Sequence, residues 1–335
     1  MSFYYSRNAM TWITRAGDVG KNSQGRPVFY GDPELSKIIS HAGCGHIRET
    51  KKGVAFNCQK PCEMKKILVP TDFSPYSQNA LNYAIGLARD MGASLHLLHT
   101  YLVHASADML ISIERYIRED AERMMEDNRQ WIHKQWPGHP PVTYDIIKGN
   151  AIPVIAGMAD QYDLVIMGTQ GASRFKDIFL GSTTNGVCKA TETPVLAIPE
   201  NARYRPLRKI VLAVDDYEVT GRNVLEPLID LAELNDADIK IFHTDLGNTD
   251  LGVDPIIGMY LAGQDYSFHY APATVKVNES IHTFVEAEKA DMLCLIGRKR
   301  AWINEVFHRS VTRREVFQTE IPLLVLTDIA VITDY

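Results

Sequence analysis

The sequence has no long apolar run, few cysteines and no excess of basic residues. None of its 335 residues fall in an apolar run near the roughly 18 residues that a membrane-spanning helix needs, so we expect no membrane partner. The amino end lacks the apolar segment of a secretory signal, which with only five cysteines favours a cytoplasmic location. A formal net charge of −6 argues against nucleic acid as a partner, because proteins that bind phosphate backbones usually carry a basic excess.

The five cysteines give little sign of a metal site or a nucleophile. Cys188 and Cys294 fall inside apolar segments, where we expect them to be small buried hydrophobic residues. Cys44, His46, Cys58 and Cys62 are formally enough for tetrahedral zinc, but their spacing matches no standard zinc pattern. We therefore assign no metal ligand, and we expect residues 1–63 to be a poorly ordered leader.

Strands and helices alternate from residue 64 to residue 199. Ser74 and Pro75 predict the start of a helix, Gly92 predicts its end, and one apolar stripe runs between them. Four members of that stripe are Ala80, Ala84, Leu87 and Met91; Ile113, Ile117, Ala121, Met124 and Met125 mark a second, longer helix that ends before Pro137. Strands are predicted at 66–70, 94–99, 142–147, 164–167 and 195–198, and further helices at 152–159 and 182–190. This alternation predicts an α/β fold with a parallel sheet and helices on both of its faces.

Residues 207–327 repeat this order after a short polar linker at 201–206. The segments 210–215, 291–297 and 319–326 match 67–72, 163–168 and 191–198. The two copies are offset by 143 residues at Asp72 and Asp215 but by 129 at Gly168 and Gly297, so the second copy is 14 residues shorter between these points. We expect the shortening at 244–274, where glycine-rich sequence replaces most of the charged second helix.

The most informative stretch is a set of glycines that follows a predicted buried strand. Gly168 comes directly after residues 164–167 and Gly171 three positions later. Gly181, Ser182 and Thr183 follow after nine intervening residues, at the start of a predicted helix. Glycine lets the backbone approach a phosphate, and the N–H groups at a helix start point toward an anion. An ordinary strand-to-helix loop would also use glycine for its turns, so both interpretations stay open at this point.

With this spacing the chain resembles the universal stress proteins in their tandem two-domain form, over residues 64–327. The resemblance is carried by the opening segment 65–72, by the glycine spacing and by the closing segment 193–196. It implies two tandem adenine-nucleotide-binding-like domains, at 64–199 and 207–327, each a five-stranded parallel sheet with helices on both faces. It also implies that the domains pair through their last strands as an intramolecular pseudo-dimer, and it allows a homodimer of two chains. It further implies that ATP binding serves stress survival.

Carried over by position, the resemblance implies two groups of nucleotide ligands. Pro70, Thr71 and Asp72 would lie against the adenosine and Met167 and Gly168 would close that site, while Gly171, Gly181, Ser182 and Thr183 would hold the phosphates. Mg²⁺ or Mn²⁺ could bridge the phosphates, although no carboxylate cluster is dedicated to it. Each residue also has a plainer role: Asp72 can favour the helix start by its charge, Ser182 can be an N-cap, and Pro70 can end a strand.

The second copy departs from the pattern, so we expect one nucleotide per chain. Gly297 is followed by three basic residues, 298–300, with no counterpart of Gly171, and Arg309 stands where the first copy has Gly181. A long side chain there would occupy the space in which backbone should meet phosphate.

Two rival functions remain. One is an adenylating enzyme of a related α/β class, but the segment 71–74 has no SGGxDS-type loop and the chain has no HIGH-type motif. The other is a scaffold that binds partners and no nucleotide. His96, His99 and His104 could suggest proton transfer, but histidines on or just after a strand are usually structural. We therefore assign no catalytic residue and expect at most weak ATP hydrolysis.

Overall fold

The computed structural model describes the backbone of residues 19–21, 27–29, 46–50, 53–57, 64–103, 110–169, 181–214, 219–245, 254–272, 277–298 and 320–328. Residues 1–61 and 62–335 form two compact units. In the first unit, β1 (Val19–Lys21) pairs with β2 (Pro27–Phe29), and β3 (His46–Thr50) pairs with β4 (Gly53–Asn57), both antiparallel. The side chains of the predicted leader's cysteines and of His46 lie outside the described part.

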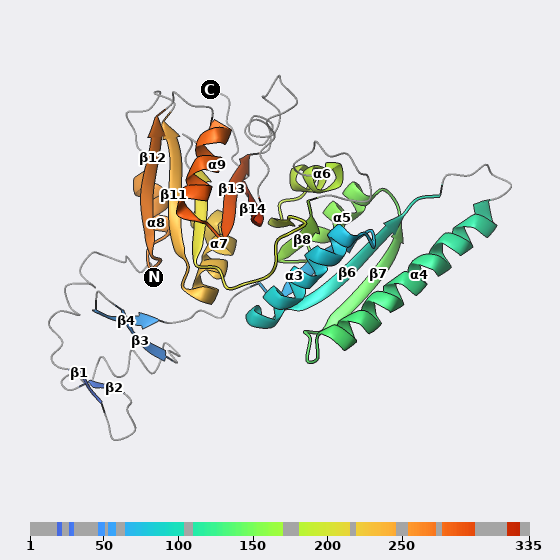
Figure 1. The fold of residues 1–335 in the computed structure, drawn as a ribbon, viewed down its shortest axis with the longest axis horizontal. Helices are drawn as coiled ribbons and strands as arrows, with labels where there is room; N and C mark the ends of the chain where they lie inside the picture. The colour runs from blue at the N-terminus through green and yellow to red at the C-terminus, as the bar shows by residue number, and fades with distance from the viewer. Residues whose placement is uncertain are drawn as a thin grey trace, which may run out of the picture. The chain divides into compact units, whose positions relative to one another are not determined.

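The second unit is built on one sheet of ten strands (Figure 1). Its first half, residues 64–199, contributes β5 (Lys66–Thr71), β6 (Ser94–Tyr101), β7 (Val142–Lys148), β8 (Leu164–Gly168) and β9 (Val195–Ile198). Its second half, residues 207–328, contributes β10 (Lys209–Val214), β11 (Asp238–Asp245), β12 (Tyr266–Pro272), β13 (Met292–Arg298) and β14 (Leu323–Asp328). The order is β12-β11-β10-β13-β14-β9-β8-β5-β6-β7.

All neighbouring strands are parallel except at the centre of the sheet. There β9 pairs antiparallel with β14, with Val195 opposite Val325 and Leu196 opposite Leu324. The predicted last strands of the two copies are therefore neighbours in one continuous sheet. A parallel-rich α/β fold is confirmed, whereas the division of this sheet into two tandem domains stays a prediction.

Helices cover both faces of the sheet, as predicted. One face packs against α3 (Pro75–Met91), α4 (Leu110–Gln135), α7 (Arg222–Asn235) and α8 (Asp254–Tyr260). The other face packs against α5 (Ala151–Ala159), α6 (Ser182–Ala190) and α9 (Val277–Glu288). Each face thus has its own apolar core, because the side chains of a buried strand alternate between the two faces.

The ends of α3 confirm the interpretation of its sequence. The Ser74 hydroxyl accepts a hydrogen bond from the N–H of Ser77 at 3.3 Å, and Gly92 ends the helix with a left-handed φ of 65°. The predicted apolar stripe from Ala80 to Met91 is buried. A side-chain cap and a terminal glycine satisfy backbone groups that the helix itself leaves unpaired.

The long helix α4 corrects one residue of the predicted apolar stripe. Met125 and Ile132 are buried against the sheet, but Met124 is 37% exposed. Successive residues of a helix are rotated by about 100°, so Met124 and Met125 cannot both face the core fully. The counterpart of α4 in the second half is α8, which has 7 residues against 26, as the shortening of the sequence predicts.

The polar segment between the two halves is packed onto α3. The Asn79 amide donates hydrogen bonds to the carbonyls of Pro199 at 2.9 Å and Ala202 at 3.0 Å. The Tyr204 hydroxyl donates to Asp90 at 2.7 Å, and its ring lies where a side chain on Gly86 would have to go. This segment is therefore fixed to the first half rather than free of it.

Candidate functional site

The predicted adenosine residues lie at the carboxyl ends of two adjacent parallel strands. Pro70 and Thr71 end β5 and are buried, and exposed Asp72 follows them; Met167, buried, and Gly168, partly exposed, end β8. The chain leaves β5 for β6 on one side and returns from β7 to β8 on the other side. This reversal of direction makes the β5/β8 edge the topological switch point, where open α/β sheets bind their ligands.

The turn after β5 is held by hydrogen bonds of Thr71 and Asp72. The Thr71 hydroxyl accepts from the N–H of Phe73 at 3.1 Å and lies 3.1 Å from the Ser77 hydroxyl. An Asp72 carboxylate oxygen accepts from the N–H of Ser74 at 3.0 Å. Asp72 thus contacts the N-cap residue of α3, while its predicted effect on the helix through charge stays a prediction, and the Thr71 hydroxyl is engaged within the protein.

Sequence reasoning missed an aromatic contact beside this turn. Phe73 has a left-handed φ of 61°, and its ring centroid lies 4.5 Å from that of His99 on β6. His99 Nδ1 lies 2.8 Å from the Thr71 carbonyl, so Nδ1 donates and the ring is fixed against the end of β5. No local pattern in the sequence indicates this contact, because it depends on the pairing of β5 with β6.

The glycine-rich loop begins and ends at the carboxyl end of β8. The Gly181 N–H donates to the carbonyl of Thr169, and the buried Thr184 hydroxyl donates to the carbonyl of Gly168 at 2.7 Å. Gly171 and the rest of the loop, 170–180, lie outside the described residues. The two bonds bring the start of α6 against the end of β8, and Thr184 is a second residue that the sequence did not single out.

The start of α6 has the features of an anion site. Gly181 is the N-cap and offers no capping side chain, Ser182 is exposed, and Thr183 is half-buried. The first N–H groups of a helix lack partners within it, and the helix dipole adds partial positive charge there. Ser182 is the first helical residue rather than the N-cap, so its predicted alternative role as a cap is wrong.

The corresponding region of the second half is described only in part. Asp215, the basic residues 298–300 as side chains, and Arg309 all lie outside the described residues. At the end of β14, the buried Asp328 carboxylate accepts from the N–H of Thr220 at 3.1 Å and also from the Thr220 hydroxyl. That carboxylate therefore serves to hold the start of α7.

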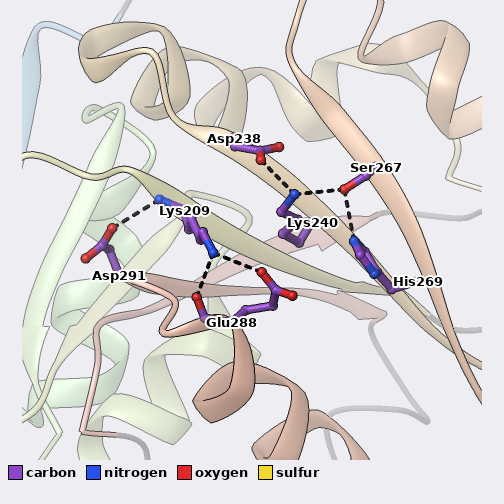
Figure 2. Close-up of polar contacts among 7 residues, drawn as sticks. All are labelled: Lys209, Asp238, Lys240, Ser267, His269, Glu288 and Asp291. Carbon is purple, nitrogen blue, oxygen red and sulfur yellow. Dashed lines mark hydrogen bonds and ion pairs between the residues drawn. The ribbon is translucent and has the colours of Figure 1, made fainter.

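A polar cluster lies at the amino-terminal ends of the strands in the second half, at the opposite edge of the sheet (Figure 2). Lys209 Nζ lies 3.0 Å from Glu288 Oε2, and Lys240 Nζ lies 2.7 Å from Asp238 Oδ2. The hydrogen bond from Lys209, with its charge, lowers the pKa of Glu288. Because the opposite charges are paired, we interpret this cluster as structural.

The two described cysteines are buried, as predicted. Cys188 is 4% and Cys294 is 0% exposed, and burial raises the pKa of the Cys188 thiol to about 12 and that of Cys294 further. A thiol with a raised pKa is a poor nucleophile. Within the described residues, no three His, Cys, Asp or Glu side chains gather as metal ligands, and no helix is long and apolar enough to cross a membrane.

Comparison with known proteins gives relatives of one kind. The universal stress protein MJ0531 of Methanocaldococcus jannaschii is 28% identical over 142 residues, which cover 40% of this chain and 81% of the relative. MJ0577 of the same organism is 27% identical over 152 residues, which cover 40% and 94%. The crystal structure of a universal stress protein from Archaeoglobus fulgidus matches with a TM-score of 0.63 at 21% identity, covering 79% of this chain and 99% of that one, and so shows a shared fold.

A family sequence model matches the first half of the sheet-forming unit. This model describes the universal stress protein family and matches residues 63–199, which contain β5 to β9 and every predicted nucleotide ligand. Residues 63–199 therefore carry a universal stress protein domain.

Proposed function

We propose that this protein binds one ATP molecule at the β5/β8 edge and acts as a regulatory protein in stress survival. The observation that carries the proposal is the meeting of three elements there. Gly181 and Thr184 join the start of α6 to the end of β8, and β8 pairs with β5 at the switch point of the sheet. Such an edge offers apolar walls for a base and backbone N–H groups for phosphates.

In this proposal the two groups of residues have different roles. Pro70 and Met167 contact the adenosine with apolar surface, and Asp72 accepts hydrogen bonds from the ribose hydroxyls. The phosphates bind to backbone N–H groups at Gly171, Ser182 and Thr183, with the Ser182 hydroxyl as a further donor. Gly181, whose own N–H is held by the carbonyl of Thr169, leaves the space in which the phosphates approach the backbone. The uncapped glycine at the start of α6 fits a phosphate, because no side chain stands between the anion and the N–H groups. Mg²⁺ or Mn²⁺ would accompany the phosphates.

We further propose that the second half is a degenerate copy and binds no nucleotide. The solved Archaeoglobus fulgidus structure aligns with 79% of the chain, so the likeness in fold extends beyond residues 63–199. The antiparallel pairing of β9 with β14 supports an intramolecular pseudo-dimer of two tandem domains. Arg309, at the position that matches Gly181, makes the second copy unsuited to phosphate.

The test replaces Gly181 by arginine, the residue that stands at the matching position of the second copy. Gly181→Arg is expected to weaken ATP binding more than tenfold, which is over about 1.4 kcal/mol, in a calorimetric titration. Gly157→Arg, on the exposed side of α5 where a new Cβ meets nothing within 4 Å, is the matched control and should bind as the wild type does. Arg309→Gly should not create a second site, because the counterpart of Gly171 is still missing.

Four outcomes would contradict this function. Two ATP molecules bound per wild-type chain would contradict the degenerate second copy, and unchanged affinity in a folded Gly181→Arg variant would remove the nucleotide from this loop. A wild-type chain that binds no adenine nucleotide would favour the scaffold instead. Steady ATP turnover would favour an enzyme instead: released pyrophosphate would indicate adenylation, and released phosphate would indicate hydrolysis.

A further inference from the structure

Two histidines face each other at the end of α4, far along the chain from the nucleotide residues. His133 lies on the last turn of α4 and is exposed; His139 lies in the turn that follows and is half-buried. His133 Nδ1 and His139 Nε2 are 2.9 Å apart, and the ring centroids are 4.5 Å apart. Neither residue belongs to the proposed nucleotide site.

A backbone carbonyl fixes which nitrogen of His139 carries the proton. His139 Nδ1 lies 2.7 Å from the carbonyl oxygen of Pro140, which can only accept, so Nδ1 is the donor. In the neutral ring the lone pair is then on Nε2, the atom that faces His133. Histidines that bind metals show the same arrangement, in which the other ring N–H donates to a carbonyl and fixes the orientation of the ring.

The surrounding turn holds the pair in place before any ligand arrives. The N–H of His139 donates to the carbonyl of Trp136 at 3.0 Å, and the N–H of Trp136 donates to that of Ile132 at 2.8 Å. The Trp136 indole N–H donates to the Asn82 side chain of α3 at 3.3 Å. The turn is thus fastened to two helices, and a site built on rigid elements needs little rearrangement to bind.

We propose that His133 and His139 form a surface site for a divalent transition-metal ion of square-planar or octahedral preference, such as Ni²⁺ or Cu²⁺. Two metal–nitrogen bonds of about 2.0–2.1 Å that meet at a right angle separate the nitrogens by about 2.9 Å, whereas a tetrahedral angle separates them by about 3.3 Å. The observed 2.9 Å is the length of the N–H···N hydrogen bond that joins the two rings, and an ion bound at a right angle would replace this hydrogen bond without moving the nitrogens apart. On binding, the His133 proton moves to Nε2, so that Nδ1 offers its lone pair, and water completes the coordination.

The charges nearby agree with a cation at this place. His133 lies on the last turn of α4, where the unpaired carbonyls give the helix a partial negative charge. Lys134, the neighbouring cation on this turn, is exposed to water, which screens its charge. Arg129, one turn earlier, is held by two hydrogen bonds from its guanidinium to Glu126, at 2.8 and 3.0 Å. That pairing reduces the repulsion that Arg129 would otherwise exert on a bound ion.

The experiment uses equilibrium dialysis to measure how much Ni²⁺ binds to the full chain. Ni²⁺ is used because Cu²⁺ oxidises thiols, and iodoacetamide first blocks the accessible thiols so that cysteines do not compete. His133→Gln and His139→Gln should each weaken Ni²⁺ binding at one site at least about tenfold. Loss of a group that only orients a metal ligand already weakens binding by about this factor, and loss of the ligand itself should cost no less. His282→Gln, which removes a half-buried histidine of α9, is the matched control and should bind as the wild type does.

The outcomes separate clearly. The variant that carries both His133→Gln and His139→Gln should bind one Ni²⁺ fewer than the wild type, and its thermal melt should be unchanged. Zn²⁺ should bind the wild-type site more weakly than Ni²⁺ does. Equal binding by the double variant and the wild type would overturn the site. A loss of the same size in His282→Gln would also overturn it, and tighter binding of Zn²⁺ would overturn the assigned geometry.

Discussion

In each half of the sheet, an aspartate at the matching position accepts hydrogen bonds from the backbone where the first strand of that half begins. In the first half, Asp163 accepts hydrogen bonds from the N–H of Lys66 at 2.9 Å and of the residue before it at 2.7 Å. In the second half, Asp291 accepts from the N–H of Lys209 at 3.0 Å and of the residue before it at 2.8 Å (Figure 2). The contacts that hold the backbone are therefore alike in both halves, as the matched sequences suggested.

The side chains on the neighbouring strands differ at equivalent places. In the first half, His96 of β6 lies opposite Thr143 of β7, with its Nδ1 2.8 Å from the threonine hydroxyl. In the second half, Lys240 of β11 lies opposite Ser267 of β12, and its Nζ donates to the serine hydroxyl at 3.1 Å. Both halves thus have a hydroxyl at this position, from Thr143 or Ser267. The residue opposite it is the histidine His96 in the first half and the lysine Lys240 in the second half.

These two comparisons separate what the fold requires from what it tolerates. The backbone N–H groups where the first strand begins have the same kind of partner in both halves, since a matching aspartate carboxylate receives their hydrogen bonds. A polar side chain at the rim of the sheet has different partners in the two halves: Lys240 pairs with Asp238 at 2.7 Å, whereas the buried His96 Nε2 lies 3.2 Å from Asp145 without a hydrogen bond. The fold also tolerates the difference in length between helices α4 and α8.

The largest effect is expected at the strands that join the two halves. Leu196 and Leu324 face each other across β9 and β14 and are 1% and 0% exposed. Changing either one to Ala should lower the free energy of unfolding by about 2–5 kcal/mol in urea denaturation, because each leaves a cavity in the shared core. Leu102→Ala, at a side chain 43% exposed, is the control with little effect. Two separate unfolding transitions, only one of them shifted, would show that the halves are independent.

The recurring carboxylates give the next largest effect. Asp291→Ala should cost about 1.5–3 kcal/mol, since it removes charged hydrogen bonds to two backbone N–H groups and an ion pair with Arg205. Asp163→Ala should cost less, because Asp163 is exposed and water replaces its contacts. The control is Asp160→Ala at the exposed end of α5. A larger loss for Asp163 than for Asp291 in the same urea titration would contradict this ranking.

A smaller effect is expected where α6 packs on α5 in the first half. A Cβ on Gly186 would lie 2.3 Å from Ile152 Cδ1, so Gly186→Ala should destabilise the protein by about 1–3 kcal/mol through overpacking. Gly157→Ala, on α5 with nothing within 4 Å, should instead stabilise by about 0.4–1 kcal/mol. Since α6 begins with the proposed phosphate ligands, ATP binding should weaken in Gly186→Ala only. Equal melting temperatures of the two variants would contradict the close contact.

Sequence reasoning predicted elements whose signals are local. The bounds of α6 and β9 and the caps of α3 are confirmed, because glycine, proline and a capping serine act on adjacent residues. It missed contacts that arise only when distant segments meet, such as Phe73 on His99 and Thr184 on the carbonyl of Gly168. Of the predicted ligands, the structure places eight at one edge of the sheet, while Gly171 lies outside the described residues.

The smallest effect concerns the imidazole that distinguishes the first half from the second. Burial lowers the pKa of His96, and Asp145, 3.2 Å from its Nε2, opposes this; Thr143 and the Tyr162 ring are its other neighbours. The unfolded chain binds a proton as the pH falls below about 6.5, while the folded chain binds it only at a lower pH. Stability is therefore lost on the acid side of that pH.

His96→Gln should make the loss of stability on acidification less steep, because glutamine takes up no proton. The equivalent change Lys240→Gln should leave the slope as it is, since a lysine stays charged in both states throughout this range. Urea denaturation of the two variants at several pH values between about 5 and 8 measures the slopes against that of the wild type. A slope unchanged in His96→Gln would mean that the difference between His96 and Lys240 has no consequence for proton uptake, and that the two halves are alike there too.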